Sequence, residues 1–193
     1  MSKTTNILLS GVGGQGIILA SKILATGLLN SGYDVKMSEV HGMAQRGGSV
    51  TTQVRFGKEV FSPIIGKGQA DILVSFEEME TAKWIEFVKP DGKVVINSYR
   101  IPSAPILIGS ADYPVHVVEE IQSKIPNTQL LNAAKLAEEL GNIKAMNVVM
   151  VGTLVKGLGL TDIDWESVIK ATVKEKFIPL NIKAFNLGMD AIQ

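Results

Sequence analysis

The chain has 193 residues, of which 46% are hydrophobic and 20% charged, so it can bury a sizeable core and is not globally disordered. Its 19 basic and 19 acidic side chains cancel, which argues against attraction to nucleic acid or to an anionic membrane surface. The absence of cysteine excludes disulfides, thiolate-bound iron–sulfur clusters and a cysteine nucleophile, and the two histidines are too isolated for a histidine-rich metal site.

The length suits one domain over residues 1–193. The first six residues, MSKTTN, lack the apolar region of a secretory signal, and no apolar run is long enough to span a bilayer. We therefore expect a soluble, cytoplasmic protein. Its zero formal net charge also suits association with other subunits.

The first predicted elements are a strand, a glycine-rich loop and a helix. A short aliphatic run over residues 7–9 indicates a buried strand, and the apolar segment 17–29 indicates a helix that ends near Asn30. The loop between them carries Gly11, Gly13, Gly14, Gln15 and Gly16. Glycine lets a ligand approach without meeting a Cβ, and the first N–H groups of a helix lack intrahelical partners. We therefore predict a cradle for a phosphate or carboxylate; the alternative is a tight turn that only allows close packing.

A second strand over residues 33–37 is predicted to complete a parallel, right-handed β-α-β unit. The loop after it should lie at the same sheet edge as the first loop, where ligands collect in open α/β sheets. Its glycines and hydrogen-bonding side chains extend the predicted ligand-binding set to His41, Gln45, Arg46, Gly47 and Gly48.

Four polar side chains near these loops each have two interpretations. Arg46 can bind a phosphate or carboxylate with two hydrogen bonds, or it can hold its own loop by donating to carbonyl groups. His41 can donate a proton or orient a ligand, although a lone loop histidine is more often structural. Gln15 can bind the ligand or cap its own helix. Glu39 can bind a ribose hydroxyl as in dinucleotide enzymes, but the loop after it is not part of that fingerprint.

The middle of the chain predicts further strands and helices. Alternating residues over 49–56 indicate a half-exposed strand, and residues 59–61 are expected to return as the second arm of a β-hairpin. Further strands are predicted over 70–76, 93–97 and 129–131, helices over 77–88, 117–125 and 133–140, a turn at 90–92 and an extended segment over 106–108. Acidic residues open the helix that starts at Glu77, where the helix dipole favours them.

The last part of the chain predicts helices. Residues 146–158 are apolar nearly all round, so this helix must be buried, with Gly152 and Gly157 allowing close approach. Asn147 near its start is most simply an N-cap, and Asp164 can cap a helix over 165–176. Pro179 suits the first turn of a final helix to about residue 192. Together the elements predict an α/β fold of three layers, α/β/α, with a mostly parallel Rossmann-like sheet, a β-hairpin insertion and C-terminal helices.

The two glycine motifs together resemble those of one known family. GVGGQGI over 11–17, EVHGMAQRGGSV over 39–50 and NVVMVGTL over 147–154 are similar to the gamma-type subunit of 2-oxoacid:ferredoxin oxidoreductases. The nearest form is the short subunit, called beta, of indolepyruvate oxidoreductase. The resemblance extends from about residue 4 to the last helix, and the two motifs together are far more specific than either alone.

The resemblance implies a gamma-type domain like domain III of pyruvate:ferredoxin oxidoreductase. Such a subunit supports the oxidative decarboxylation of a 2-oxoacid, with the acyl group passed to coenzyme A and electrons passed to ferredoxin. Thiamine diphosphate, magnesium and iron–sulfur clusters are expected on partner subunits, which agrees with the lack of cysteine. Asp91-Gly92 also lacks the surrounding pattern of a thiamine diphosphate–magnesium motif. The glycine-loop residues and the His41–Gly48 segment match the family motifs, although Met146 stands where relatives often have a smaller residue.

Three functions therefore stay open at this point. The first is a subunit of such a heteromeric oxidoreductase. We expect it to be inactive alone, because partner subunits supply the cofactors, and a homodimer is an option in isolation. The second is a free-standing NAD(P)- or FAD-binding enzyme that uses the first glycine loop and Glu39. The third is a structural or assembly module. The sequence does not reveal which 2-oxoacid is used.

Overall fold

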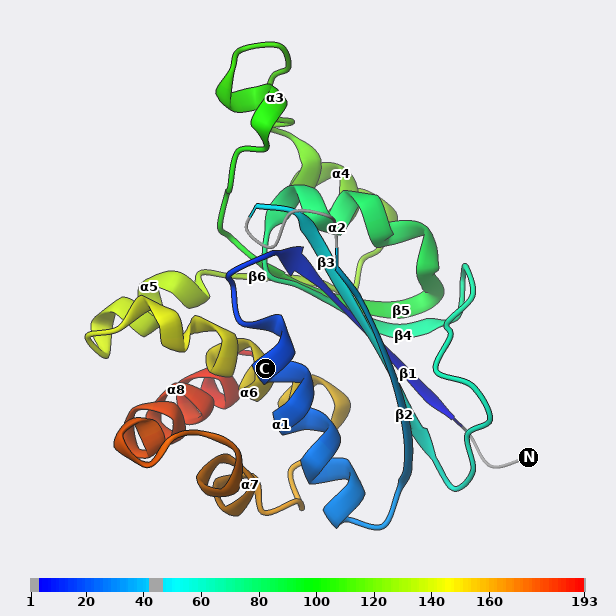
Figure 1. The fold of residues 1–193 in the computed structure, drawn as a ribbon. Coiled ribbons are helices and arrows are strands. Elements are labelled where there is room, and N and C mark those ends of the chain that lie inside the picture. The colour runs from blue at the N-terminus through cyan, green and yellow to red at the C-terminus, as the bar shows by residue number, and fades with distance from the viewer. Residues whose placement is uncertain (1–3, 42–46, 193) are drawn as a thin grey trace.

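The computed structural model describes residues 4–41 and 47–192. Its centre is a six-stranded sheet in the order β2-β3-β1-β4-β5-β6, with helices on both faces (Figure 1). The strands are β1 Thr5–Val12, β2 Asp34–His41, β3 Ser49–Gly57, β4 Ala70–Ser75, β5 Val88–Asn97 and β6 Thr128–Leu131. The helices are α1 Ile17–Asn30, α2 Glu78–Trp84, α3 Ala104–Leu107, α4 Val117–Lys124, α5 Ala133–Glu139, α6 Met146–Leu158, α7 Trp165–Thr172 and α8 Ile178–Asp190. Short 3₁₀ turns are η1 Ile85–Phe87, η2 Ile143–Ala145 and η3 Glu175–Phe177.

Two hydrophobic cores lie on opposite faces of the sheet, which confirms the three-layer α/β/α prediction. Successive side chains of a strand point to opposite faces. Accordingly, Ile7 and Leu9 of β1 belong to the larger core, with α1, α5, α6, α7 and α8. Leu8 belongs to the smaller core, which α4 covers.

The sheet is mixed, because β3 runs antiparallel between β1 and β2 while β1, β4, β5 and β6 are parallel. Strands β1 and β2 therefore run in the same direction, as the expected β-α-β unit requires, but β3 lies between them. The prediction that residues 59–61 return as a hairpin arm is wrong, since the antiparallel partner of β3 on its outer side is β2. Side-chain hydrogen bonds hold the loop after β3 instead: the backbone N–H of Val60 donates to Asp34 at 2.8 Å.

Two further local expectations differ from the structure. The strand over 49–56 is mostly buried rather than half-exposed, because it is an interior strand whose Gln53 accepts a hydrogen bond from Ile65 N at 2.6 Å. The segment expected to be extended over 106–108 instead lies partly in α3, whose first turn contains Pro105. Proline suits that position because its missing N–H would have no helical partner there.

The C-terminal helices are present as predicted, but α7 ends at Thr172, short of its predicted end at residue 176. Helix α6 has the expected bounds and is buried nearly all round, and Asp164 caps α7 by accepting from Ser167 N at 3.0 Å. Helices α6 and α8 cross so closely that a Cβ on Gly188 would lie 1.9 Å from the carbonyl oxygen of Val149. None of the helices in the described part of the chain combines the length and apolar character that crossing a bilayer requires.

Candidate functional site

The first glycine loop connects the carboxyl end of β1 to α1. Gly16 is the N-cap of α1 and adopts a left-handed conformation with a φ of 79°. Among the residues that the structure describes, no side chain caps this helix, and its first turn contains no acidic residue, so its leading N–H groups meet no carboxylate of that turn. Gly14 is exposed, and a Cβ added there would meet nothing within 4 Å. The helix dipole and the free amides make this a suitable place for an anion.

The two glycine motifs touch each other, as the sequence predicts. The N–H of Gly13 donates to the carbonyl of Gly48 at 2.8 Å, and the N–H of Gly47 donates to the carbonyl of Gly13 at 3.4 Å. Gly11, the first glycine of the motif, is buried in β1 opposite Val50. His41, the last residue of β2, pairs with the same Val50, so its backbone lies two strand spacings, roughly 10 Å, from Gly11.

Gln45 and Arg46 of the second motif lie outside the described residues, and His41 is described only by its backbone. Their predicted roles in ligand binding or catalysis stay predictions.

The side chain of Gln15 is buried and fastens the loop to the neighbouring strand. Its Oε1 accepts from Val12 N at 2.7 Å, and its Nε2 donates to the carbonyl of Phe76 at 2.6 Å. The same carbonyl accepts from Asn97 Nδ2 at 3.1 Å. Asn97 Oδ1 in turn accepts from Ala133 N at 2.9 Å, so one buried network joins the loop to β4, β5 and α5. These contacts correspond to a structural role for Gln15, while ligand binding by it stays a prediction.

Asn147 also belongs to the loop's surroundings, and the prediction that it caps α6 is wrong. The N-cap position of α6 is Ala145, because the 3₁₀ turn η2 already leads into the helix. Asn147 instead donates from Nδ2 to the carbonyl of Gly16 at 3.1 Å. A Cβ on Gly16 would lie only 2.5 Å from that nitrogen. The buried amide of Asn147 therefore ties the loop to α6, whereas Gln15 ties it to the end of β4.

A pocket of about 530 Å³ opens beside the glycine loop. Besides the loop, its walls are mainly apolar with one cation, and they comprise Leu19, Tyr99, Ile101, Ile143, Lys144, Met146 and Asn147. A smaller pocket of about 270 Å³ adjoins the same glycines on the side of Ile18 and Val50. The arrangement can hold an anionic group at the amides while an apolar part of the ligand lies along Tyr99.

Sequence reasoning missed most of this wall. Tyr99 and Ile101 follow the carboxyl end of β5, and Lys144 lies in η2, so none belongs to a glycine motif. Their only sequence signal is that Tyr99 and Ile101 follow a predicted strand, since the carboxyl ends of parallel strands share one edge.

Three nearly inaccessible carboxylates lie at the start of α2, beneath the same edge: Glu77, Glu78 and Glu80. Glu77 accepts hydrogen bonds from Tyr113 Oη at 2.6 Å, from Glu80 N at 2.9 Å and from Ile101 N at 3.2 Å. Glu80 accepts from Ser49 Oγ at 2.5 Å. Burial, followed by the hydrogen bond to Glu77, raises the pKa of Tyr113 well above its usual value, so this hydroxyl stays a proton donor.

The geometry around Glu39 does not support a dinucleotide site. Glu39 accepts from Ser21 Oγ of α1 at 3.2 Å. Strand β3 separates Glu39 from β1, whereas the dinucleotide fingerprint places the acidic residue on the strand next to the first one.

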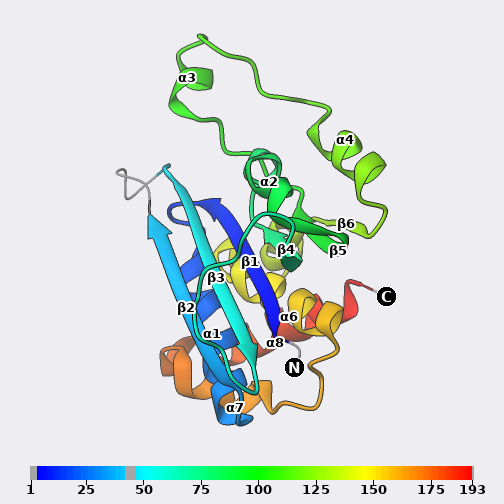
Figure 2. The ribbon, with the colours of Figure 1, turned by 90° about the vertical axis from the view of Figure 1, so that its right-hand side faces the viewer.

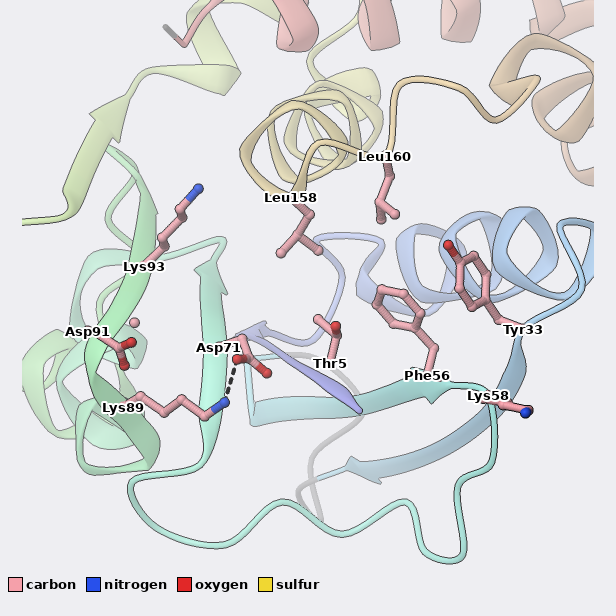
Figure 3. A pocket seen from close by; sticks show the side chains of 12 residues that line it. Thr5, Tyr33, Phe56, Lys58, Asp71, Lys89, Asp91, Lys93, Leu158 and Leu160 are labelled. Atoms are coloured by element: carbon pink, nitrogen blue, oxygen red, sulfur yellow. Dashed lines mark hydrogen bonds and ion pairs between the residues drawn. The ribbon is translucent and has the colours of Figure 1, made fainter. Parts of the chain in front are cut away.

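Another pocket, of about 500 Å³, lies at the opposite edge of the sheet (Figure 3). Lys89 and Asp71 form an ion pair there, and Lys93 donates to the carbonyl of Gly157 at 2.6 Å. None of the predicted site residues lines it. Within the described residues, no three histidine, aspartate or glutamate side chains are close enough together to hold a metal ion.

Residues 6–191 match the family model described as pyruvate ferredoxin/flavodoxin oxidoreductase. Indolepyruvate oxidoreductase subunit IorB of Thermococcus kodakarensis is 39% identical over 98% of this chain and 96% of its own length. Ketoisovalerate oxidoreductase subunit VorA of Methanothermobacter marburgensis is 27% identical over 97% of this chain, but the match covers only 36% of VorA. The crystal structure of a keto/oxoacid ferredoxin oxidoreductase gamma subunit from Geobacter sulfurreducens superimposes with a TM-score of 0.70 at 25% identity, covering 96% of each chain.

Proposed function

This chain belongs to the pyruvate ferredoxin/flavodoxin oxidoreductase family, and we propose that it works as the gamma-type subunit of a heteromeric 2-oxoacid:ferredoxin oxidoreductase. In this role, residues 1–193 form one cytoplasmic domain that supports coenzyme A-dependent oxidative decarboxylation, with ferredoxin as the electron acceptor. Indolepyruvate is the first substrate to test, because the Thermococcus relative carries that name.

The residues present do not suit an iron–sulfur cluster or a bound metal ion. The chain has no cysteine to bind an iron–sulfur cluster, and its described part offers no cluster of metal-binding side chains. We therefore assign thiamine diphosphate, magnesium and the iron–sulfur clusters to partner subunits. This chain contributes binding and shielding at its glycine-loop edge.

The observation that carries the proposal is the contact between the two glycine motifs beside an open pocket. Gly13 is hydrogen-bonded to both Gly47 and Gly48, and the pocket of about 530 Å³ adjoins the first loop. Coenzyme A has phosphate groups that suit the leading amides of α1 and an extended arm that suits the wall at Tyr99. Lys144 adds a positive charge on the far wall.

Lys144→Ala tests this assignment in the reconstituted complex. Losing one exposed cation near a phosphate should raise the KM for coenzyme A by about 3-fold, while the KM for the 2-oxoacid stays unchanged. Lys135→Ala is the matched control, because Lys135 is an exposed lysine on α5 that does not line the pocket. Equal KM values for coenzyme A in both variants and the wild type would reject this pocket as its binding site.

A further inference from the structure

An arm projects from the body of the molecule beside the glycine-loop edge. Residues 98–116 leave the carboxyl end of β5 and carry the short helix α3 at their tip, well away from the sheet (Figures 1 and 2). Residues 101–111 contain no charged side chain. At the tip, Leu107 is 72% exposed and Ile108 is 78% exposed. An uncharged segment with two exposed aliphatic side chains has the composition of an interface core rather than of a solvated loop.

The base of the arm is fixed to the body through both of its chain segments, the one that leaves the body and the one that returns to it. Arg100 Nε donates to Glu78 at 2.7 Å, and Tyr113 Oη donates to Glu77 at 2.6 Å. The guanidinium of Arg100 also lies 5.1 Å from the centre of the Tyr113 ring. Because Glu77 and Glu78 are buried at the start of α2, these contacts hold the arm in a defined direction. A preorganised element loses less conformational entropy when it docks.

The position of the arm indicates which partner covers it. Tyr99 and Ile101, at its base, line the glycine-loop pocket, so the arm begins beside that pocket and a protein bound to the arm is held next to it. In VorA the same domain is matched to only 36% of a longer chain, so there it is covalently joined to further polypeptide. A membrane surface is disfavoured, since membrane-binding segments usually carry lysine or arginine and residues 101–111 carry none.

We propose that this arm is the docking element for the partner subunit of the oxidoreductase complex, which receives Leu107 and Ile108 in an apolar socket. The inference rests on the proposed function, because it requires such a partner. The arm then serves to place the partner over the glycine-loop edge.

The test uses the full chain and the partner subunit isolated from the native complex, with the dissociation constant measured by calorimetry. The double variant Leu107→Asp/Ile108→Asp should weaken binding by at least about 30-fold, because it would bury two carboxylates in an apolar socket. Its circular dichroism and melting temperature should match the wild type, since both side chains are exposed. Phe61→Asp is the matched control: Phe61 is 87% exposed in the loop after β3, and this variant should bind normally.

Each contrary result has a distinct meaning. Unchanged affinity of the double variant for the partner would overturn the docking role of the arm and leave the proposed function intact. The same conclusion would follow if the wild-type chain self-associated in sedimentation, or bound anionic lipid vesicles, and the substitutions abolished only that property and left binding to the partner unchanged. Failure of the wild-type chain to bind the partner would instead overturn the proposed function, and the arm's role with it.

Discussion

At the scale of single residues, Gly16 is constrained by two independent requirements. Its φ of 79° lies in the left-handed region, and a Cβ would also collide with the Asn147 amide at 2.5 Å. Gly14, two residues earlier, has a φ of 103° but faces open space. The two positions therefore separate backbone strain from steric collision within one loop.

Gly16→Ala should lower the free energy of unfolding by about 2–4 kcal/mol, the sum of a left-handed alanine and a collision with Asn147. Gly14→Ala should lower the free energy of unfolding by only about 1–2 kcal/mol, because it strains the backbone without a collision. Urea unfolding of the isolated chain measures both. Equal losses in the two variants would show that Asn147 yields without cost and does not constrain the loop.

Some contacts between single residues were predictable from the sequence and others were not. The contact of Gly13 with Gly47 and Gly48 was predictable, because both loops follow strands that end at one edge. The contact of Asn147 with Gly16 was not, since it joins positions 131 residues apart and a local pattern suggests only a helix cap. The buried bonds of Gln15 to Phe76 likewise depend on which strand lies next to β1.

At the scale of elements, the strands and helices were mostly predictable and their neighbours were not. The spacing of apolar residues located β1, α1, β4 and α6, because each of these segments is buried on one or more faces and its own residues show it. Pairing depends on distant segments: β3 inserts between β1 and β2, and nothing within residues 49–56 specifies that position. The arm of residues 98–116 was missed because its carboxylate anchors, Glu77 and Glu78, lie at the N-terminus of α2, about 20 residues or more away in the sequence.

The crossing of α6 and α8 gives a sharp test at this scale. Gly188→Ala would place a Cβ 1.9 Å from the carbonyl of Val149, so we expect a loss of at least about 3 kcal/mol in the free energy of unfolding. Gly157→Ala is the control within α6, because its Cβ would make only ordinary contacts at 3.6 Å. The free energy of unfolding of that variant should be unchanged or higher by up to about 1 kcal/mol, because alanine favours a helix more than glycine does. Similar melting curves for the two variants would contradict the close crossing.

The cap of α7 predicts a dependence of stability on pH. Hydrogen bonds from Ser167 lower the pKa of Asp164 below its usual 3.8. Because the pKa is lower in the folded state, the carboxylate contributes its full stabilisation of the folded protein above about pH 4. This stabilisation is lost as the pH falls through the folded-state pKa. Asp164→Ala should therefore lower Tm by about 2–4 °C at pH 7, and by less near pH 3.

Asp164→Asn is the control for this effect, because asparagine caps helices without titrating. Thermal melts of the three proteins between pH 3 and pH 7 measure it. A difference between wild type and Asp164→Ala that stays constant over this range would argue against a charged cap.

At the scale of the whole molecule, several features indicate that this chain works within an assembly. The glycine-loop edge is open, and the arm beside it exposes Leu107 and Ile108. The sequence has no cysteine with which to bind the clusters that ferredoxin-linked chemistry needs. The composition and the paired glycine motifs predict a division of labour with partner subunits, whereas the arm and the pocket wall required the structure.

The most direct test is a complementation assay of 2-oxoacid-dependent dye reduction with coenzyme A and thiamine diphosphate. It compares this chain alone, the partner subunit alone and the two recombined, with indolepyruvate as the first substrate. We predict negligible turnover by this chain alone and a gain of at least about 100-fold when it is added to the partner, the effect of completing a preorganised site. Substantial turnover by this chain alone, or a partner whose rate is the same without it, would contradict the account.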